Sequence, residues 1–203
     1  AFRLLRLADE HDFVVVEDDV YCDLHPGASL QPCTRLAALD QLRRVIYVGG
    51  FSKTLAANLR VGFVACSPEL ARELTDLKML IGLTSPEFGE RIVYRVLSEG
   101  HYRRHLHRLR ERLSRARDPV LRQLERLGLR AFATPPVGMF VWADAGVDTS
   151  PVAQAMLERG FLMAPGSLFL PDQRPSTWMR FNVATSAGSR MLAELDRVLQ
   201  RCG

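Results

Sequence analysis

The first hundred residues alternate between helical spacing of apolar positions and short, continuous apolar runs. Residues 4–12, "LLRLADEHD", place apolar side chains about one helical turn apart and predict a helix. The runs "FVVVEDD", "RVIYVGG" and "RVGFVAC" do not alternate with polar residues, so each predicts a strand buried on both faces. A further helix opens at Ser67 and Pro68, a cap residue followed by proline. Helices that alternate with buried strands are typical of the α/β class.

From residue 101 the pattern changes to one long helix and then to shorter elements. In residues 101–128 the apolar positions fall near heptad spacing and arginines occupy much of the remainder. This predicts a connecting helix that is broken near Pro119. Short strands, turns and capped helices follow. We therefore expect an incomplete large α/β domain over residues 1–100, a connecting helix over 101–128 and a small α+β domain over 129–203, with Trp142 in its core.

Composition narrows the classes of protein. The chain has 203 residues, of which 47% are hydrophobic and 25% charged, values that are ordinary for a globular protein. No apolar run reaches the ~18 residues that span a bilayer, so no membrane segment is expected. The four cysteines are scattered without a CxxC pair, which disfavours disulfides and zinc and favours the cytoplasm. His101, His105 and His107 lack ligand spacing to an acid or cysteine, so we expect a solvated helix face and no metal site.

Two of the predicted strands end in residues that are able to do chemistry. Asp18, Asp19 and Tyr21 follow the first, and Lys53 and Arg60 follow the second. In an open α/β sheet, ligands bind outside the carboxyl ends of the strands. An amine forms a Schiff base with an aldehyde, a carboxylate keeps a pyridine nitrogen protonated, and a guanidinium binds a phosphate. Together these groups predict a site for pyridoxal phosphate. An acid that follows a strand most often caps a turn, and this is expected of Asp19.

Glycines accompany the lysine. Gly49 and Gly50 end the apolar run just before it. Because glycine has no Cβ, both are expected to let the backbone approach a ligand closely.

The motifs "EDDVY", "FSKTLAANLRVGF" and "WMRFNVA" resemble those of the fold-type I pyridoxal-phosphate aminotransferases. The stretch around "EGHYRRHLHRLR" resembles most the aminotransferase-like domain of MocR-type regulators of the GntR superfamily. The resemblance covers the whole chain. It implies the C-terminal part of this fold, in which residues 1–100 belong to the large cofactor-binding domain. We therefore expect a longer protein, with the first half of the large domain upstream.

The family's cofactor and substrate contacts carry over to six positions of this sequence. They are the Schiff-base lysine Lys53, the pyridine-nitrogen carboxylate Asp18, the phenol Tyr21 at the ring 3-oxygen, the phosphate contacts Ser52 and Arg60, and Arg180 for the carboxylate of an amino acid. The resemblance also implies a homodimer.

Three functions are open at this point. The chain is the effector-sensing domain of a transcriptional regulator that binds DNA through an N-terminal domain absent here, or it is part of an active aminotransferase. The third function, a basic helical module that binds nucleic acid directly, leaves the buried strands and Lys53 without a purpose. The arginine run is better explained as a solvated face. The regulator is the preferred interpretation, because of the resemblance of the 99–110 segment.

Overall fold

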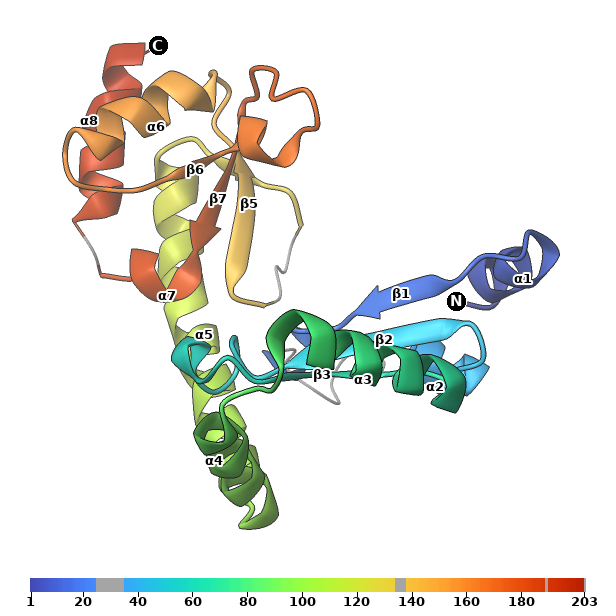
Figure 1. Cartoon of the computed structure of the whole chain (residues 1–203). Coiled ribbons are helices and arrows are strands. Elements are labelled where there is room, and N and C mark those ends of the chain that lie inside the picture. The colour runs from blue at the N-terminus through green and yellow to red at the C-terminus, as the bar shows by residue number, and fades with distance from the viewer. Residues whose placement is uncertain (25–34, 134–137, 189, 203) are drawn as a thin grey trace. The chain divides into compact units, whose positions relative to one another are not determined.

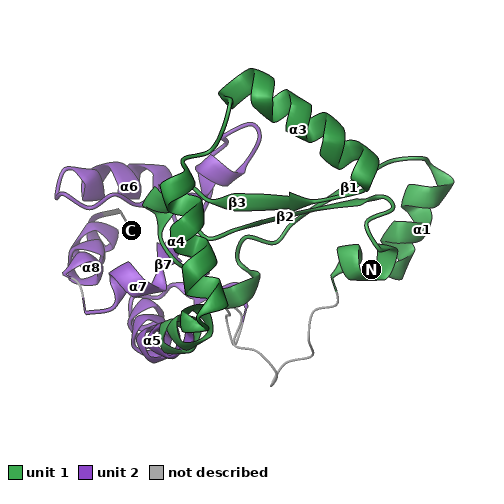
Figure 2. Ribbon diagram, turned by 60° about the horizontal axis from the view of Figure 1, so that its bottom comes forward, with its two compact units in different colours: residues 1–109 green, residues 110–203 purple. Residues whose placement is uncertain are grey.

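The protein folds into two compact units. The structure, a computed structural model, describes residues 1–24, 35–133, 138–188 and 190–202 (Figure 1). Unit 1 comprises residues 1–109 and unit 2 residues 110–203 (Figure 2). Helix α5 (His101–Arg126) contains the boundary between them. The predicted connecting helix over 101–128 therefore corresponds to one element that belongs to both units.

Unit 1 is built on a three-stranded mixed sheet in the order β1-β2-β3. Its strands are β1 (Val15–Asp18), β2 (Val45–Gly50) and β3 (Gly62–Ala65). β1 and β2 are parallel and pair Asp18 with Val48, whereas β3 is antiparallel to β2 and pairs Gly62 with Gly50. The carboxyl ends of β1 and β2 and the amino end of β3 therefore meet at one edge of the sheet.

Unit 1 also contains helices α1 to α4, of which α3 runs alongside the sheet (Figures 1 and 2). They are α1 (Phe2–Glu10), α2 (Leu36–Asp40), α3 (Pro68–Gly82) and α4 (Glu87–Ser98), with short 3-10 turns η1 (Cys22–Leu24) and η2 (Ala57–Leu59). Helix α3 begins as predicted, with the Ser67 hydroxyl accepting from the Leu70 amide at 3.4 Å. Helix α2 is capped from β1, because the Glu17 carboxylate accepts from the Leu36 and Ala37 amides at 2.9 Å each.

The expectation that the strands of unit 1 are buried on both faces is wrong for this chain. Val16 in β1 is 63% exposed, and Phe63 and Val64 in β3 are 47% and 51% exposed. Accessible and less accessible residues alternate along β1. No described element packs closely enough to bury these apolar side chains, so the continuous apolar runs identify the strands but not the cover over them.

Unit 2 is a four-stranded antiparallel sheet in the order β4-β5-β7-β6. The strands are β4 (Arg130–Ala131), β5 (Phe140–Asp144), β6 (Ala164–Pro165) and β7 (Trp178–Asn182). The helical elements are α6 (Thr149–Leu157), the 3-10 turn η3 (Gly166–Phe169), α7 (Val183–Ser186) and α8 (Met191–Cys202). Helices α6 and α8 lie together beside the sheet (Figure 1).

The sheet of unit 2 has one buried face and one open face. Val141 and Ala143 of β5 and Met179 and Phe181 of β7 are at most 1% exposed and belong to a core that includes residues of α5, α6 and α8. Their neighbours in sequence point to the other face, since side chains alternate along a strand. Trp142 lies on that open face, so the expectation that it belongs to the core is wrong.

Helix α5 continues through Pro119 and is not broken there. The residue after the proline, Val120, is fully buried and Leu124 is 2% exposed, and both belong to the core of unit 2. Burial of these two side chains offsets the hydrogen bond that proline removes from the helix. None of the described helices is both long and apolar enough to cross a membrane.

Candidate active site

The register of unit 1 brings the predicted cofactor residues to one edge of its sheet. Asp18 is the last residue of β1, and Lys53 lies three residues beyond the end of β2. Arg60 lies two residues before β3, which starts where β2 ends because Gly50 pairs with Gly62. Tyr21 follows β1 closely. The carboxylate, phenol, amine and guanidinium of the candidate site therefore all come from strand ends that meet at this edge.

Lys53 and Tyr21 lie close together. The Nζ atom of Lys53 is 5.9 Å from the centroid of the Tyr21 ring, within the range of a cation–π contact. Tyr21 is 41% exposed and Lys53 is also exposed, so both side chains are accessible to a ligand. The two residues come from segments that are 32 positions apart, and parallel pairing of β1 with β2 joins them.

The two acids after β1 have different surroundings. Asp18 is exposed, its carboxylate accepts only a local bond from the Val20 amide at 3.3 Å, and among the described residues of unit 1 it has no ion pair. Asp19 instead accepts from Arg35 Nε at 2.6 Å and from the Tyr47 hydroxyl at 2.9 Å. Burial and donation to Asp19 raise the pKa of Tyr47 to about 12. Asp19 is therefore a partner of side chains from other elements rather than the turn cap expected from the sequence, and Asp18 is the acid left for a ligand.

The loop that carries Lys53 is anchored from α5. The next residue, Thr54, is only 2% exposed, and its hydroxyl lies 2.8 Å from the hydroxyl of Tyr102. His105 Nε2 lies 2.8 Å from the Thr54 carbonyl oxygen. Within the loop, the Leu55 amide donates to the Phe51 carbonyl at 2.8 Å. These contacts hold the backbone on both sides of Lys53.

Sequence reasoning missed these anchors. The sequence pattern does not mark Tyr102, and it predicts a solvated helix face for His105, whereas His105 is partly buried against Thr54. Tyr102 also donates to the Asp23 carboxylate at 2.7 Å, and burial together with this bond raises its pKa. The spacing of Tyr102 and His105, three residues apart on one helix face, is the pattern that indicates a shared contact.

Glycines shape the loop for reasons internal to the protein. A Cβ on Gly49 would collide with the ring of Phe63, so the absence of a side chain makes room for that ring. Gly49 is therefore explained by packing against the Phe63 ring, and not by close approach of a ligand as expected from the sequence. Gly50 meets nothing closer than 3.7 Å. On α4, a Cβ on Gly89 would lie 2.7 Å from the Leu59 carbonyl oxygen, so this helix packs directly against the segment before Arg60.

The phosphate candidates lie in the same loop. Arg60 follows η2 as its C-cap residue, with φ at +53° in the left-handed region, and its side chain is exposed. Ser52, beside the lysine, is half-buried. A guanidinium at this edge of the sheet suits a phosphate, which it binds through paired N–H groups.

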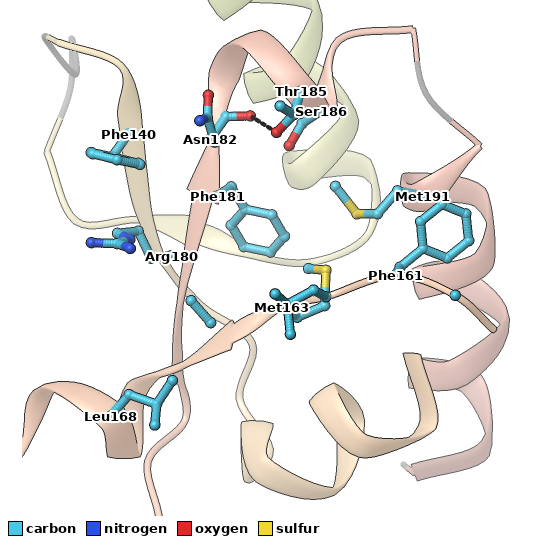
Figure 3. A pocket seen from close by; sticks show the side chains of 13 residues that line it. Phe140, Phe161, Met163, Leu168, Arg180, Phe181, Asn182, Thr185, Ser186 and Met191 are labelled. Atoms are coloured by element: carbon cyan, nitrogen blue, oxygen red, sulfur yellow. Dashed lines mark hydrogen bonds between the residues drawn. The ribbon is translucent and has the colours of Figure 1, made fainter. Parts of the chain in front are cut away.

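Arg180 belongs to unit 2, whereas the other five candidates belong to unit 1. It lies in β7 and lines a pocket of about 640 Å³ together with Phe140, Phe161, Met163 and other apolar residues (Figure 3). In Figure 3, Arg180 and Phe181 project to opposite sides of β7, as expected for neighbours in a strand.

The side chains of unit 1 fit pyridoxal phosphate. Lys53 offers an amine for the aldehyde, and Tyr21 beside it offers a phenol for the ring oxygen. Asp18 offers an exposed carboxylate with no cation already bound to it among the described residues of the unit. All three side chains are exposed at the same sheet edge.

Comparison with known proteins agrees with this chemistry. The family described as aminotransferase class I and II matches residues 3–198. The aromatic-amino-acid aminotransferase 1 of Thermococcus litoralis is 34% identical over 89% of this chain and 44% of its own length. The uncharacterized HTH-type transcriptional regulator YisV of Bacillus subtilis is 28% identical over 97% of this chain and 42% of its own length.

Solved structures show the same fold. A Pyrococcus horikoshii kynurenine aminotransferase superposes with a TM-score of 0.84 at 29% identity, covering 98% of this chain and 50% of that one. LysN, the α-aminoadipate aminotransferase of Thermus thermophilus, superposes with a TM-score of 0.82 at 28% identity, covering 98% and 54%. The chain thus has the α/β fold of the fold-type I aminotransferases, which implies pyridoxal phosphate as cofactor. It spans about half the length of these relatives.

Proposed function

Because the chain belongs to the class I and II aminotransferases, we propose that it forms the C-terminal part of a pyridoxal-phosphate-dependent transaminase acting on an amino acid. The observation that carries this proposal is the Lys53 amine 5.9 Å from the Tyr21 ring, at the sheet edge where β1 also delivers Asp18. Higher identity to named aminotransferases than to named regulators supports the enzymatic choice.

Each side chain has a task in this proposal. Pyridoxal phosphate, when bound, supplies an electron sink that stabilises negative charge at the Cα of an amino acid. Asp18 keeps the pyridine nitrogen protonated, and Tyr21 donates a hydrogen bond to the ring oxygen. Lys53 would hold the aldehyde of the cofactor, and its amine would carry a proton from Cα of the amino acid to C4′ of the cofactor, first as general base and then as general acid.

The remaining candidates bind charged groups. Ser52 and Arg60 hold the phosphate at the loop between β2 and β3. Arg180 in unit 2 binds the carboxylate of the amino acid, because a planar guanidinium pairs with a carboxylate through two parallel N–H bonds. As in dimeric relatives of this fold, we expect the full-length protein to be a homodimer in the cytoplasm.

A second candidate function is the effector-sensing domain of a GntR/MocR-type transcriptional regulator. The match to YisV over 97% of this chain favours it. Both functions use the same residues of this chain, so the discriminating observations lie elsewhere. A helix-turn-helix region upstream of residue 1 favours the regulator, and formation of keto acid from amino acids by the purified full-length protein favours the enzyme.

The attachment of the cofactor tests the proposal directly. The full-length protein is incubated with pyridoxal phosphate, reduced with borohydride and digested, and the modified peptide is identified by mass spectrometry. We expect the cofactor on Lys53 and its loss in Lys53→Ala. Lys78, the other lysine of these 203 residues and an exposed residue of α3, is the matched control, and Lys78→Ala is expected to leave the modification intact. Attachment that persists unchanged in Lys53→Ala contradicts the proposal.

A further inference from the structure

Two aromatic rings enclose the guanidinium of Arg180. Its Cζ atom lies 4.4 Å from the centroid of the Phe140 ring and 4.7 Å from that of Phe169. Both distances are well inside the ~6 Å range of cation–π contacts. Phe140 comes from β5 and Phe169 from η3, so the rings approach from different elements. A guanidinium is planar, and rings packed on it leave its N–H edge as the part that a ligand reaches.

The described side chains of unit 2 do not use that edge. Among these residues, the guanidinium of Arg180 has no hydrogen bond and no ion pair. An arginine that only stabilises the sheet is expected to pair with an acid or a carbonyl, as Arg130 does with Asp144 at 3.1 Å on the neighbouring strands. Arg180 is therefore held by aromatic packing, with its donors available.

The ring of Phe169 is itself held in place by a row of aromatic side chains on the open face of the sheet. Trp142, the register partner of Arg180, meets Phe169 edge to face at a centroid distance of 5.1 Å. Trp178 stacks on Trp142 at 6.0 Å with the ring planes 6° apart. These contacts restrict the Phe169 ring.

The backbone under Phe169 is equally constrained. Turn η3 begins at Gly166, where a Cβ would lie 2.6 Å from the Trp178 carbonyl oxygen, so only glycine allows the turn to lie on β7. The Gly166 amide donates to the Thr149 hydroxyl at 3.2 Å. The hydroxyls of Ser150 and Ser167 lie 3.1 Å apart. Turn η3 is thus fastened both to β7 and to the start of α6.

We propose that Phe140 and Phe169 are positioning residues that hold the guanidinium of Arg180 in one plane, with its N–H edge directed at a carboxylate ligand. The proposal rests on the assignment of Arg180 as the carboxylate-binding residue. A free arginine side chain loses rotamer entropy when it is fixed. Because the two rings already fix the side chain in the folded protein, this entropy is lost during folding. The loss therefore does not oppose binding of the amino acid.

The first test compares three variants of the full-length protein loaded with pyridoxal phosphate. Phe169→Leu removes the ring, Phe169→Tyr restores it, and Phe132→Leu removes a ring of the same face that contacts Trp178 and not Arg180. Each is titrated with L-phenylalanine, L-glutamate and L-2-aminoadipate, and the change in cofactor absorbance is followed. A cation–π contact of about 0.5–2 kcal/mol predicts a Kd raised about 2- to 30-fold in Phe169→Leu.

The pattern across variants separates positioning from general damage. We expect unchanged cofactor affinity in all three variants, and wild-type amino-acid affinity in Phe169→Tyr and Phe132→Leu. An unchanged Kd in Phe169→Leu, or an equal loss of cofactor and amino-acid affinity, overturns the proposal. Failure of Phe169→Tyr to restore binding does so as well, since the aromatic face is then not what matters.

The second test needs no ligand and is independent of the proposed function. In protein labelled with 15N-arginine, the Nε–H resonance of Arg180 is assigned by its disappearance in Arg180→Lys. Ring currents from two faces are expected to shift it upfield of solvent-exposed arginines, and Phe169→Leu is expected to move it toward them, whereas Phe132→Leu leaves it in place. If the wild type binds none of the three amino acids, the assigned role of Arg180 fails while this resonance still reports the enclosure. A resonance that Phe169→Leu does not move refutes the positioning.

Discussion

The hydroxyl of Tyr102 offers the sharpest test of how the lysine loop is held. It donates to the Asp23 carboxylate at 2.7 Å and lies 2.8 Å from the hydroxyl of Thr54, the buried residue next to Lys53. Tyr102→Phe removes this one oxygen. The ring remains, together with its edge-to-face contact with Phe51 at 5.7 Å. The variant therefore probes the hydrogen bonds without creating a cavity.

The expected cost follows from the partners. A hydrogen bond to a charged group contributes about 1.5–3 kcal/mol. In addition, the hydroxyl of Thr54, a residue that is only 2% exposed, loses its hydrogen-bond partner. We therefore expect the loop to open about 10- to 140-fold more often in Tyr102→Phe, since every 1.4 kcal/mol is a factor of ten.

Amide hydrogen exchange measures this opening locally. The amides of Leu55 and Ala56 both donate to the Phe51 carbonyl, at 2.8 and 3.1 Å, and exchange only when the loop opens. We expect their exchange in the full-length protein to accelerate by the factor above. The amide of Phe132, which donates to the Trp142 carbonyl in unit 2, is an internal reference that is expected to stay unchanged.

Tyr94→Phe is the matched control, because this tyrosine of α4 is 72% exposed. Exchange of Leu55 and Ala56 should not change in it. If Tyr102→Phe leaves these two amides within about twofold of wild type, the anchoring of the lysine loop by α5 is refuted. Acceleration of all amides alike, including that of Phe132, would instead show global destabilisation.

Two further predictions concern packing and pH. Gly49→Ala places a Cβ against the Phe63 ring and is expected to lower the free energy of unfolding, measured by chemical denaturation, by about 1–3 kcal/mol. Gly50→Ala, whose Cβ meets no atom nearer than 3.7 Å, is expected to lower it by less. Equal losses in the two variants contradict the packing explanation. Hydrogen bonds from the Gly146 amide, then from Thr177 and Arg130, lower the pKa of Asp144 in the folded protein. The carboxylate therefore stabilises the fold at pH values above the unfolded pKa of about 3.9, and this stabilisation is lost as the pH falls through the folded pKa. Asp144→Asn is therefore expected to unfold at lower urea than wild type at pH 7, with the gap narrowing below pH about 4; a gap independent of pH refutes the assignment.

The sequence by itself identified many of the elements and placed the candidate side chains at strand ends. Continuous apolar runs identified β1, β2 and β3, and the Ser67–Pro68 pair marked the start of α3, because strand and helix formation depend on neighbouring residues. The sequence also placed Asp18 and Lys53 after two predicted strands, whose carboxyl ends bind ligands in an open α/β sheet, and parallel pairing of β1 with β2 in the structure makes these ends neighbours.

Only the tertiary structure decided which partners the side chains at those ends have. The resemblance assigns the pyridine nitrogen to Asp18, but the different surroundings of Asp18 and Asp19 arise because Arg35 and Tyr47, from elsewhere in the chain, donate to Asp19. The spacing of Tyr102 and His105 places both on one face of α5, but only the fold shows that this face contacts Thr54, about fifty residues away. The apolar run around Trp142 predicts a core residue, yet Trp142 lies on the open face of the sheet beside Arg180. Periodicity gives the alternation of faces, but which face is covered depends on long-range packing, and that is fixed only when the whole chain folds.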